Sequence, residues 1–236
     1  MNDYQSHSKL EGIRDWRDRL SYSRDEGTGF AAPGGEFTRA LFEWSFTPRG
    51  KILHSLLEGR RVVELGAGMM SYGYALASTC GAKNFVAVEP FYSDIQEKSI
   101  LSHLSKNEGL NFRIPYKIVS QDMLAYLEEE SDDLLCIIAC GIEDCILPGT
   151  GYRKKVENQI TRTMEKNSFF LSSHSDLFPQ SLKHIEMTFQ RSSNPKVFDR
   201  LRLHGRKLAY EVYRNELNSF EIRHRDCLKL NLPVPI

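Results

Sequence analysis

The 236-residue sequence has no long apolar run, no excess of charge of either sign and no repeated segment. No stretch approaches the roughly 18 apolar residues of a membrane helix, and residues 1–12 are polar and contain no apolar signal core. Lysine plus arginine and aspartate plus glutamate number 31 each, so no global positive field gathers phosphate backbones. We therefore expect a cytoplasmic protein that binds neither membranes nor nucleic acid. Its oligomeric state is left open.

Cysteine is scarce, and it is scattered along the chain. The sequence contains five cysteines, an odd number, and their spacings match no common zinc-binding pattern. We expect reduced cysteines with packing roles and no metal site. These residues are Cys80, Cys136, Cys140, Cys145 and Cys227.

The proportion of charged residues, 26%, and of hydrophobic residues, 41%, is typical of a soluble globular domain with elaborations. Residues 1–59 differ from the rest in their sequence pattern. A glycine-rich loop there precedes two expected helices, Glu36 to Phe46 and Arg49 to Glu58. We predict a helical N-terminal extension over residues 1–59 and one main domain over residues 60–236. The aromatic side chains of the extension either cover the sheet or form a lid over a substrate.

The most informative segment begins at Arg61, where a short apolar strand leads into a tight glycine turn. Gly66 and Gly68 allow a ligand to approach the backbone closely, and a helix expected to begin near Met70 offers unpaired N–H groups. Glu64 lies two residues before the first glycine. A carboxylate at this position favours a cofactor that carries positive charge there.

Four further segments are expected to be strands of a parallel sheet, since each is a mostly apolar run followed by polar or glycine residues. Alternating residues on both sides of a glycine turn predict an antiparallel hairpin formed by residues 198–203 and 208–213. The expected fold is therefore α/β, a doubly wound, mostly parallel sheet with a C-terminal antiparallel hairpin. The four segments are Asn84 to Pro90, Pro115 to Ser120, Asp133 to Cys140, which we expect to be central, and Ser168 to Ser173.

The order of these features resembles class I S-adenosylmethionine-dependent methyltransferases. The resemblance covers roughly residues 50–215 and rests on the Glu-Leu-Gly-Ala-Gly pattern that begins at Glu64, on Glu89 and Asp122 after later strands, and on the apolar strand that runs into Gly141. It implies S-adenosylmethionine as the cofactor, with Glu64 near the methionine ammonium and Glu89 on the ribose. It also implies that Asp122 and Met123 hold the adenine. The complete predicted cofactor set is Glu64, Gly66, Ala67, Gly68, Glu89, Asp122, Met123, Cys140 and Gly141.

The resemblance implies methyl transfer to an oxygen, nitrogen or carbon nucleophile of a small molecule. The Asn/Asp-Pro-Pro-Tyr/Phe motif of many nucleobase amino-methyltransferases is absent after the fourth strand. His174 and Glu143 are candidate bases, because they follow the fifth and fourth strands at the expected ligand edge. We expect Phe37, Trp44 and Tyr152 to line the acceptor site.

Two other interpretations remain open from the sequence. A nicotinamide-dependent oxidoreductase would carry a third glycine where this chain has Ser71, and Glu64 would repel its pyrophosphate. A noncatalytic S-adenosylmethionine-binding module would keep the cofactor pocket without an acceptor cavity. Met70 also departs from the pattern, since many methyltransferases of this class have glycine there.

Overall fold

The computed structural model describes ten parts of the chain and places seven strands in one sheet. The described residues are 38, 40–68, 71–90, 113–131, 135–142, 147, 149–164, 168–173, 175–190 and 217–224. The strands are β1 (Arg61–Leu65), β2 (Asn84–Val88), β3 (Tyr116–Val119), β4 (Leu135–Cys140), β5 (Phe169–Ser173), β6 (Lys183–Gln190) and β7 (Leu217–His224).

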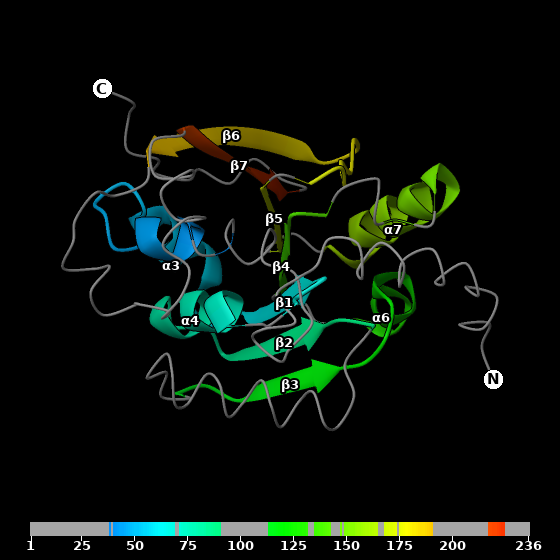
Figure 1. Cartoon of the computed structure of the whole chain (residues 1–236), viewed down its shortest axis with the longest axis horizontal. Helices are drawn as coiled ribbons and strands as arrows, with labels where there is room; N and C mark the ends of the chain where they lie inside the picture. The colour runs from blue at the N-terminus through cyan, green and yellow to red at the C-terminus, as the bar shows by residue number, and fades with distance from the viewer. Residues whose placement is uncertain are drawn as a thin grey trace, which may run out of the picture.

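The strand order is β3-β2-β1-β4-β5-β7-β6, and β1 to β5 pair in parallel (Figure 1). β4 is the middle strand, as predicted, and all six of its residues are buried. A strand that is buried on both faces needs an apolar side chain at nearly every position, which is why the mostly buried β1, β2, β4 and β5 could be recognised. β3 lies at the end of the strand order and is only partly buried. The predicted α/β class, the doubly wound sheet and the antiparallel end of the sheet are confirmed.

The antiparallel end of the sheet is formed by β6 and β7. β7 pairs antiparallel with β5 and with all eight residues of β6, so it lies between them. The hairpin predicted at residues 198–203 and 208–213 lies outside the described residues. Among the described residues, the strand between β5 and β6 is Leu217–His224, in a segment for which the sequence suggested no role.

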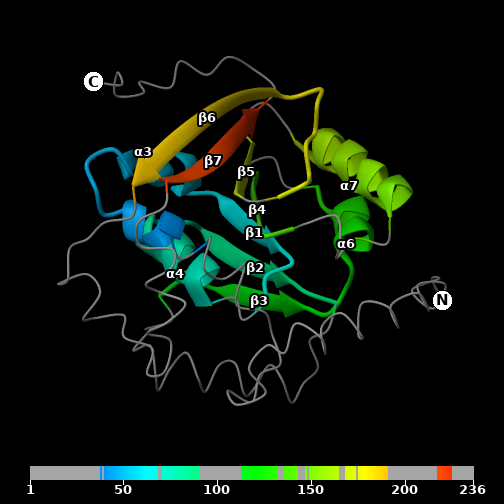
Figure 2. The same cartoon turned by 45° about the horizontal axis from the view of Figure 1, so that its top comes forward.

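Helices cover both faces of the sheet, and each face has its own apolar cluster. Helices α3 (Lys51–Leu57) and α4 (Ser71–Thr79) cover one face, while α6 (Met123–Glu129) and α7 (Thr150–Thr163) cover the other (Figures 1 and 2). Side chains of β1 alternate between these clusters, because successive residues of a strand point to opposite faces. No helix in the described parts of the chain is both long enough and apolar enough to cross a membrane.

The described part of the N-terminal segment packs onto the α4 face. Residues 38 and 40–44 are helical, and α3 follows after Gly50, where any side chain would collide with the carbonyl oxygen of Trp44. Leu41, Trp44 and apolar residues of α3 belong to the same buried cluster as α4. Residues 40–57 therefore share a core with the sheet. The division of the chain at residue 59 stays a prediction.

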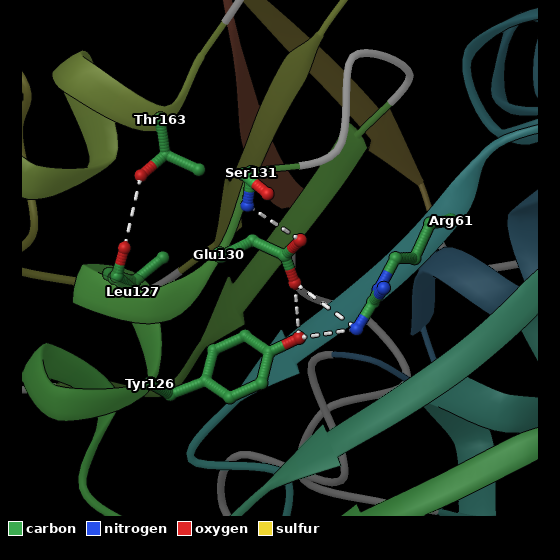
Figure 3. Close-up of polar contacts among 6 residues, drawn as sticks. All are labelled: Arg61, Tyr126, Leu127, Glu130, Ser131 and Thr163. Atoms are coloured by element: carbon green, nitrogen blue, oxygen red, sulfur yellow. Dashed lines mark hydrogen bonds and ion pairs between the residues drawn. The ribbon is translucent and has the colours of Figure 1, made fainter.

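A polar network ties β1 to α6 at the edge of the sheet where β1 begins (Figure 3). The Arg61 guanidinium donates to the hydroxyl of Tyr126 at 3.1 Å and lies 3.3 Å from a carboxylate oxygen of Glu130. The Tyr126 hydroxyl in turn donates to Glu130. Burial and the Glu130 carboxylate raise the pKa of Tyr126, so its hydroxyl keeps its proton. On the same helix, the carbonyl of Leu127 accepts from Thr163 of α7 at 3.4 Å.

We predict that Tyr126→Phe destabilises the fold without changing the opposite, carboxyl-terminal edge of the sheet. The change removes the hydroxyl that joins Arg61 to Glu130, whose side chain is only 4% exposed. Losing a hydrogen bond to a buried charged group costs about 1–3 kcal/mol. Urea denaturation of both proteins measures this difference. An unchanged midpoint would show that the network contributes no net stability.

Candidate functional site

The loop after β1 forms a turn that glycine alone accommodates without strain. Gly66 and Gly68 have φ values of 63° and 49°, in the left-handed region. A Cβ atom at Gly66 would lie 2.5 Å from Cδ1 of Ile142, which follows β4. Between the glycines, the N–H of Ala67 donates to the carbonyl of Val88 at 3.2 Å. The turn is therefore held against the ends of both strands that flank β1.

Glu89 follows β2 and contacts the same turn. One of its carboxylate oxygens accepts from the N–H of Gly68 at 3.4 Å, and its own N–H donates to the carbonyl of Val119 at 3.1 Å. Only 8% of Glu89 is exposed. The structure thus brings the carboxylate predicted for the ribose beside the predicted glycine turn.

Glu64 is a nearly completely buried carboxylate on β1, with 5% of its surface exposed. Oε1 accepts a hydrogen bond from Oγ1 of Thr38 at 3.0 Å. Oε2 is buried and has no hydrogen-bond partner among the described residues. Helix α4 passes directly over the carboxylate at Gly73, where a Cβ atom would collide with Oε2.

Burial raises the pKa of Glu64 to about 8, and the Thr38 hydrogen bond acts in the opposite direction. Loss of water disfavours the charged form of a carboxyl group, and a cation at the unpartnered oxygen would favour it again. This part of the structure therefore suits a ligand that carries a positive charge. A ligand phosphate next to Glu64 would meet repulsion instead.

The end of β4 completes the edge of the site. Gly141 has a φ of 67°, and its N–H donates to the carbonyl of Ser173 at 3.0 Å. Burial, and next the charge of Glu64, raise the pKa of the Cys140 thiol to about 12. Cys140 is therefore a neutral packing residue beside Glu64. Cys80, Cys136 and Cys140 are free thiols, and no cluster in the described ranges could hold a metal ion.

Asp122 is the N-cap of α6. Its Oδ1 accepts from the N–H groups of Leu124 and Ala125 at 2.8 and 2.9 Å, as an N-cap carboxylate does. The same oxygen accepts from the hydroxyl of Tyr152 at 3.1 Å. This hydrogen bond links Asp122, which was predicted to bind the adenine, to Tyr152, which was predicted to line the acceptor site. The roles in binding of Asp122, Tyr152 and the buried Met123 stay predictions.

The other predicted residues are not part of this arrangement. Trp44 is 4% exposed and packs in the apolar cluster beneath α4, as a residue that covers the sheet would. Its contact with an acceptor stays a prediction. The remaining predicted positions, Phe37, Glu143 and His174, lie outside the described residues, as do Met69 and Met70.

Three residues of the site were not predicted from the sequence. Gly73 carried a local signal, because a glycine within a helix is costly and commonly has a packing reason. Ile142, the neighbour of Gly66, follows a recognised strand but has no distinctive motif. Thr38 is 26 residues from Glu64 in the sequence, and nothing local indicates their contact.

The structure places a glycine turn, a buried carboxylate before it and an acidic residue after the next strand at the carboxyl ends of parallel strands, where open α/β folds bind their ligands. No model of a protein family matches the sequence, and neither does any curated protein. Solved structures do match. Several are described as methyltransferases or methylases, one of them in complex with S-adenosylhomocysteine, and another is described as a protein of the NADB-Rossmann superfamily. The sheet order described above establishes the fold, and membership of the methyltransferase family stays a prediction.

Three of these structures illustrate how distant the likeness is. A proposed S-adenosylmethionine-dependent methyltransferase from Streptococcus mutans has 18% identity and a TM-score of 0.45, over 74% of this chain and 47% of that one. This chain thus spans about half the length of that protein. A ribosomal protein L11 methylase from Lactobacillus delbrueckii has 15% identity and a TM-score of 0.48, over 84% of this chain and 83% of that one. An rRNA methylase from Streptococcus thermophilus has 12% identity and a TM-score of 0.44, over 75% of this chain and 93% of that one. At such identities the likeness extends no further than the fold.

We predict that Glu64 makes stability depend on pH between about 4.5 and 8. Because its pKa is about 8 in the folded protein and 4.5 as a free side chain, folding takes up a proton in this range. The free energy of unfolding of the wild type should therefore fall, relative to that of Glu64→Gln, as pH rises from 5 to 8. The neighbouring thiol of Cys140 does not titrate in this window.

Denaturant unfolding of both proteins at pH 5 and pH 8 measures this effect. Glutamine is the matched control, since it keeps the shape of the side chain and cannot ionise. If the free energy of unfolding changed with pH in the same way for both proteins, Glu64 would not be desolvated in the folded state.

Proposed function

We propose that this protein is an S-adenosylmethionine-dependent methyltransferase. The observation that carries the proposal is a buried carboxylate oxygen of Glu64, near the end of the strand that leads into the glycine turn, which has no hydrogen-bond partner among the described residues. A protein retains such a group at a considerable cost in free energy. A cofactor with an ammonium group and a sulfonium supplies the positive charge that offsets this cost.

The other residues of the edge suit the remaining parts of this cofactor. Gly66 and Gly68 let the backbone approach the methionine portion, which Glu64 meets directly or through a water molecule. Glu89 is held beside Gly68 by the 3.4 Å hydrogen bond and is the group we assign to the ribose hydroxyls. Asp122 and Met123, after the neighbouring strand β3, are assigned to the adenine.

For methyl transfer, the protein needs mainly to align the cofactor with the acceptor and to exclude water. S-adenosylmethionine supplies a methyl group on a sulfonium, which becomes a neutral thioether when a nucleophile displaces it in line. The chain contributes a cofactor site whose carboxylates are 5% and 8% exposed at Glu64 and Glu89, so water is largely excluded there. A base such as His174 or Glu143 is required only if the acceptor is a poor nucleophile, such as a hydroxyl.

The acceptor we propose is a small molecule with an oxygen, nitrogen or carbon nucleophile. Its support is the balance of 31 basic and 31 acidic residues, which provides no overall attraction for nucleic acid. Macromolecular acceptors are named for some structures of similar fold, among them a ribosomal protein methylase and an rRNA methylase. Cell extract separated into small molecules, protein and RNA, and then incubated with the protein and methyl-labelled S-adenosylmethionine, distinguishes these classes. Label only in the protein or RNA fraction would overturn the small-molecule assignment.

We predict that S-adenosylhomocysteine binds the wild-type protein and that Glu89→Ala weakens binding at least tenfold. Loss of hydrogen bonds between a carboxylate and the ribose accounts for a change of this size. Isothermal titration calorimetry measures both affinities. Tyr126→Phe is the control for stability, because Tyr126 contacts Arg61 and Glu130 away from this edge.

The same titration decides between the competing interpretations. Absence of binding, or undiminished binding to Glu89→Ala, would contradict the proposal. Binding of reduced nicotinamide cofactor instead, followed by its fluorescence, would identify an oxidoreductase. Binding of S-adenosylhomocysteine together with no transfer to any extract fraction would identify a noncatalytic module.

A further inference from the structure

We infer that Thr38 is a positioning residue of the cofactor site, because its hydroxyl orients the Glu64 carboxylate and leaves the second oxygen for the cationic end of the cofactor. The inference rests on the proposed function, and it deepens it by making the segment before β1 part of the site. Thr38 is 1% exposed, and its hydrogen bond to Oε1 is buried and 3.0 Å long.

Three elements enclose the carboxylate of Glu64. Thr38 contacts it from the helical residues before α3, Gly73 lies against it from α4, and Cys140 lies near it at the end of β4. The absence of a side chain at Gly73 creates the space that Oε2 occupies. Among these neighbours Cys140 is the only titratable group, and its thiol is neutral. Thr38 therefore provides the hydrogen bond that fixes the orientation of the carboxylate.

The direction of this hydrogen bond, with the Thr38 hydroxyl as the donor, matters for binding a cation. A hydroxyl that donates to a carboxylate favours the ionised form, which opposes the effect of burial. Threonine at position 38 therefore makes it easier for Glu64 to become charged when a cation arrives. A valine of nearly the same shape would fill the space, but it would leave both oxygens without a donor.

A purely structural role would give a different result. If the hydroxyl only satisfied a buried oxygen, its removal would lower stability and leave the affinity for the cofactor unchanged. If it positions Glu64, its removal also lowers that affinity, and the effect disappears once the carboxylate is gone. A double-mutant cycle between Thr38 and Glu64 separates the two roles.

The experiment measures S-adenosylhomocysteine affinity by calorimetry at pH 7 for the wild type, Thr38→Val, Thr38→Ser, Glu64→Gln and the double variant Thr38→Val/Glu64→Gln. We expect Thr38→Val to bind about tenfold more weakly, the loss typical of a hydrogen bond to a charged group. Thr38→Ser, which keeps the hydroxyl, should bind within about twofold of the wild type. In the Glu64→Gln background, Thr38→Val should have little further effect.

The matched control is Thr163→Val, which removes the hydroxyl of another buried threonine, one that contacts the carbonyl of Leu127 between α7 and α6. It should lower thermal stability and leave affinity unchanged. Equal affinities of Thr38→Val and the wild type would overturn the inference, as would an undiminished effect of Thr38→Val in the Glu64→Gln background. If Thr38→Val does not fold, Thr38→Ala, which also lacks the hydroxyl, takes its place in the cycle, and the same outcomes support or overturn the inference. A wild type that binds no S-adenosylhomocysteine would overturn the proposed function itself.

Discussion

The burial of one carboxylate, that of Glu64, constrains much of the site. A carboxyl group that is to ionise inside the apolar face of a sheet requires a donor, space and a compensating charge. Thr38 provides the donor, and the missing side chain of Gly73 provides the space. The compensating charge is not provided by any described neighbour, and this is the property that points to a cationic ligand.

The parallel sheet places the Glu64 carboxylate next to other ligand-facing groups, because the carboxyl ends of its strands meet at one edge. Gly68 contacts Glu89, Gly66 fits against Ile142, and the loop after β4 is tied to β5 through Gly141 and Ser173. Each contact joins the ends of two neighbouring strands. The positions of the ligand-facing groups therefore depend on strand register rather than on a single loop.

The two edges of the sheet have different tasks. At the edge where β1 begins, Arg61, Tyr126 and Glu130 hydrogen-bond to one another and join the sheet to α6. At the opposite edge, Glu64 keeps an oxygen with no hydrogen-bond partner in the described part of the chain, which costs stability. Proteins commonly tolerate such costs where they bind ligands, and stabilise the fold elsewhere.

The amino-acid sequence by itself determined the five parallel strands, the glycine turn and the acidic residues at Glu64 and Glu89. These features depend on local rules, since strands of a covered parallel sheet are mostly apolar and a turn with positive φ favours glycine. Only the tertiary structure decided that β7 comes from Leu217–His224, because its pairing with β5 and β6 bridges long separations and its residues show no apolar run. The same holds for Thr38, whose contact with Glu64 across 26 residues arises from packing against a completed sheet. Local pattern specifies the elements, whereas the contacts that bury and orient Glu64 exist only after those elements have assembled.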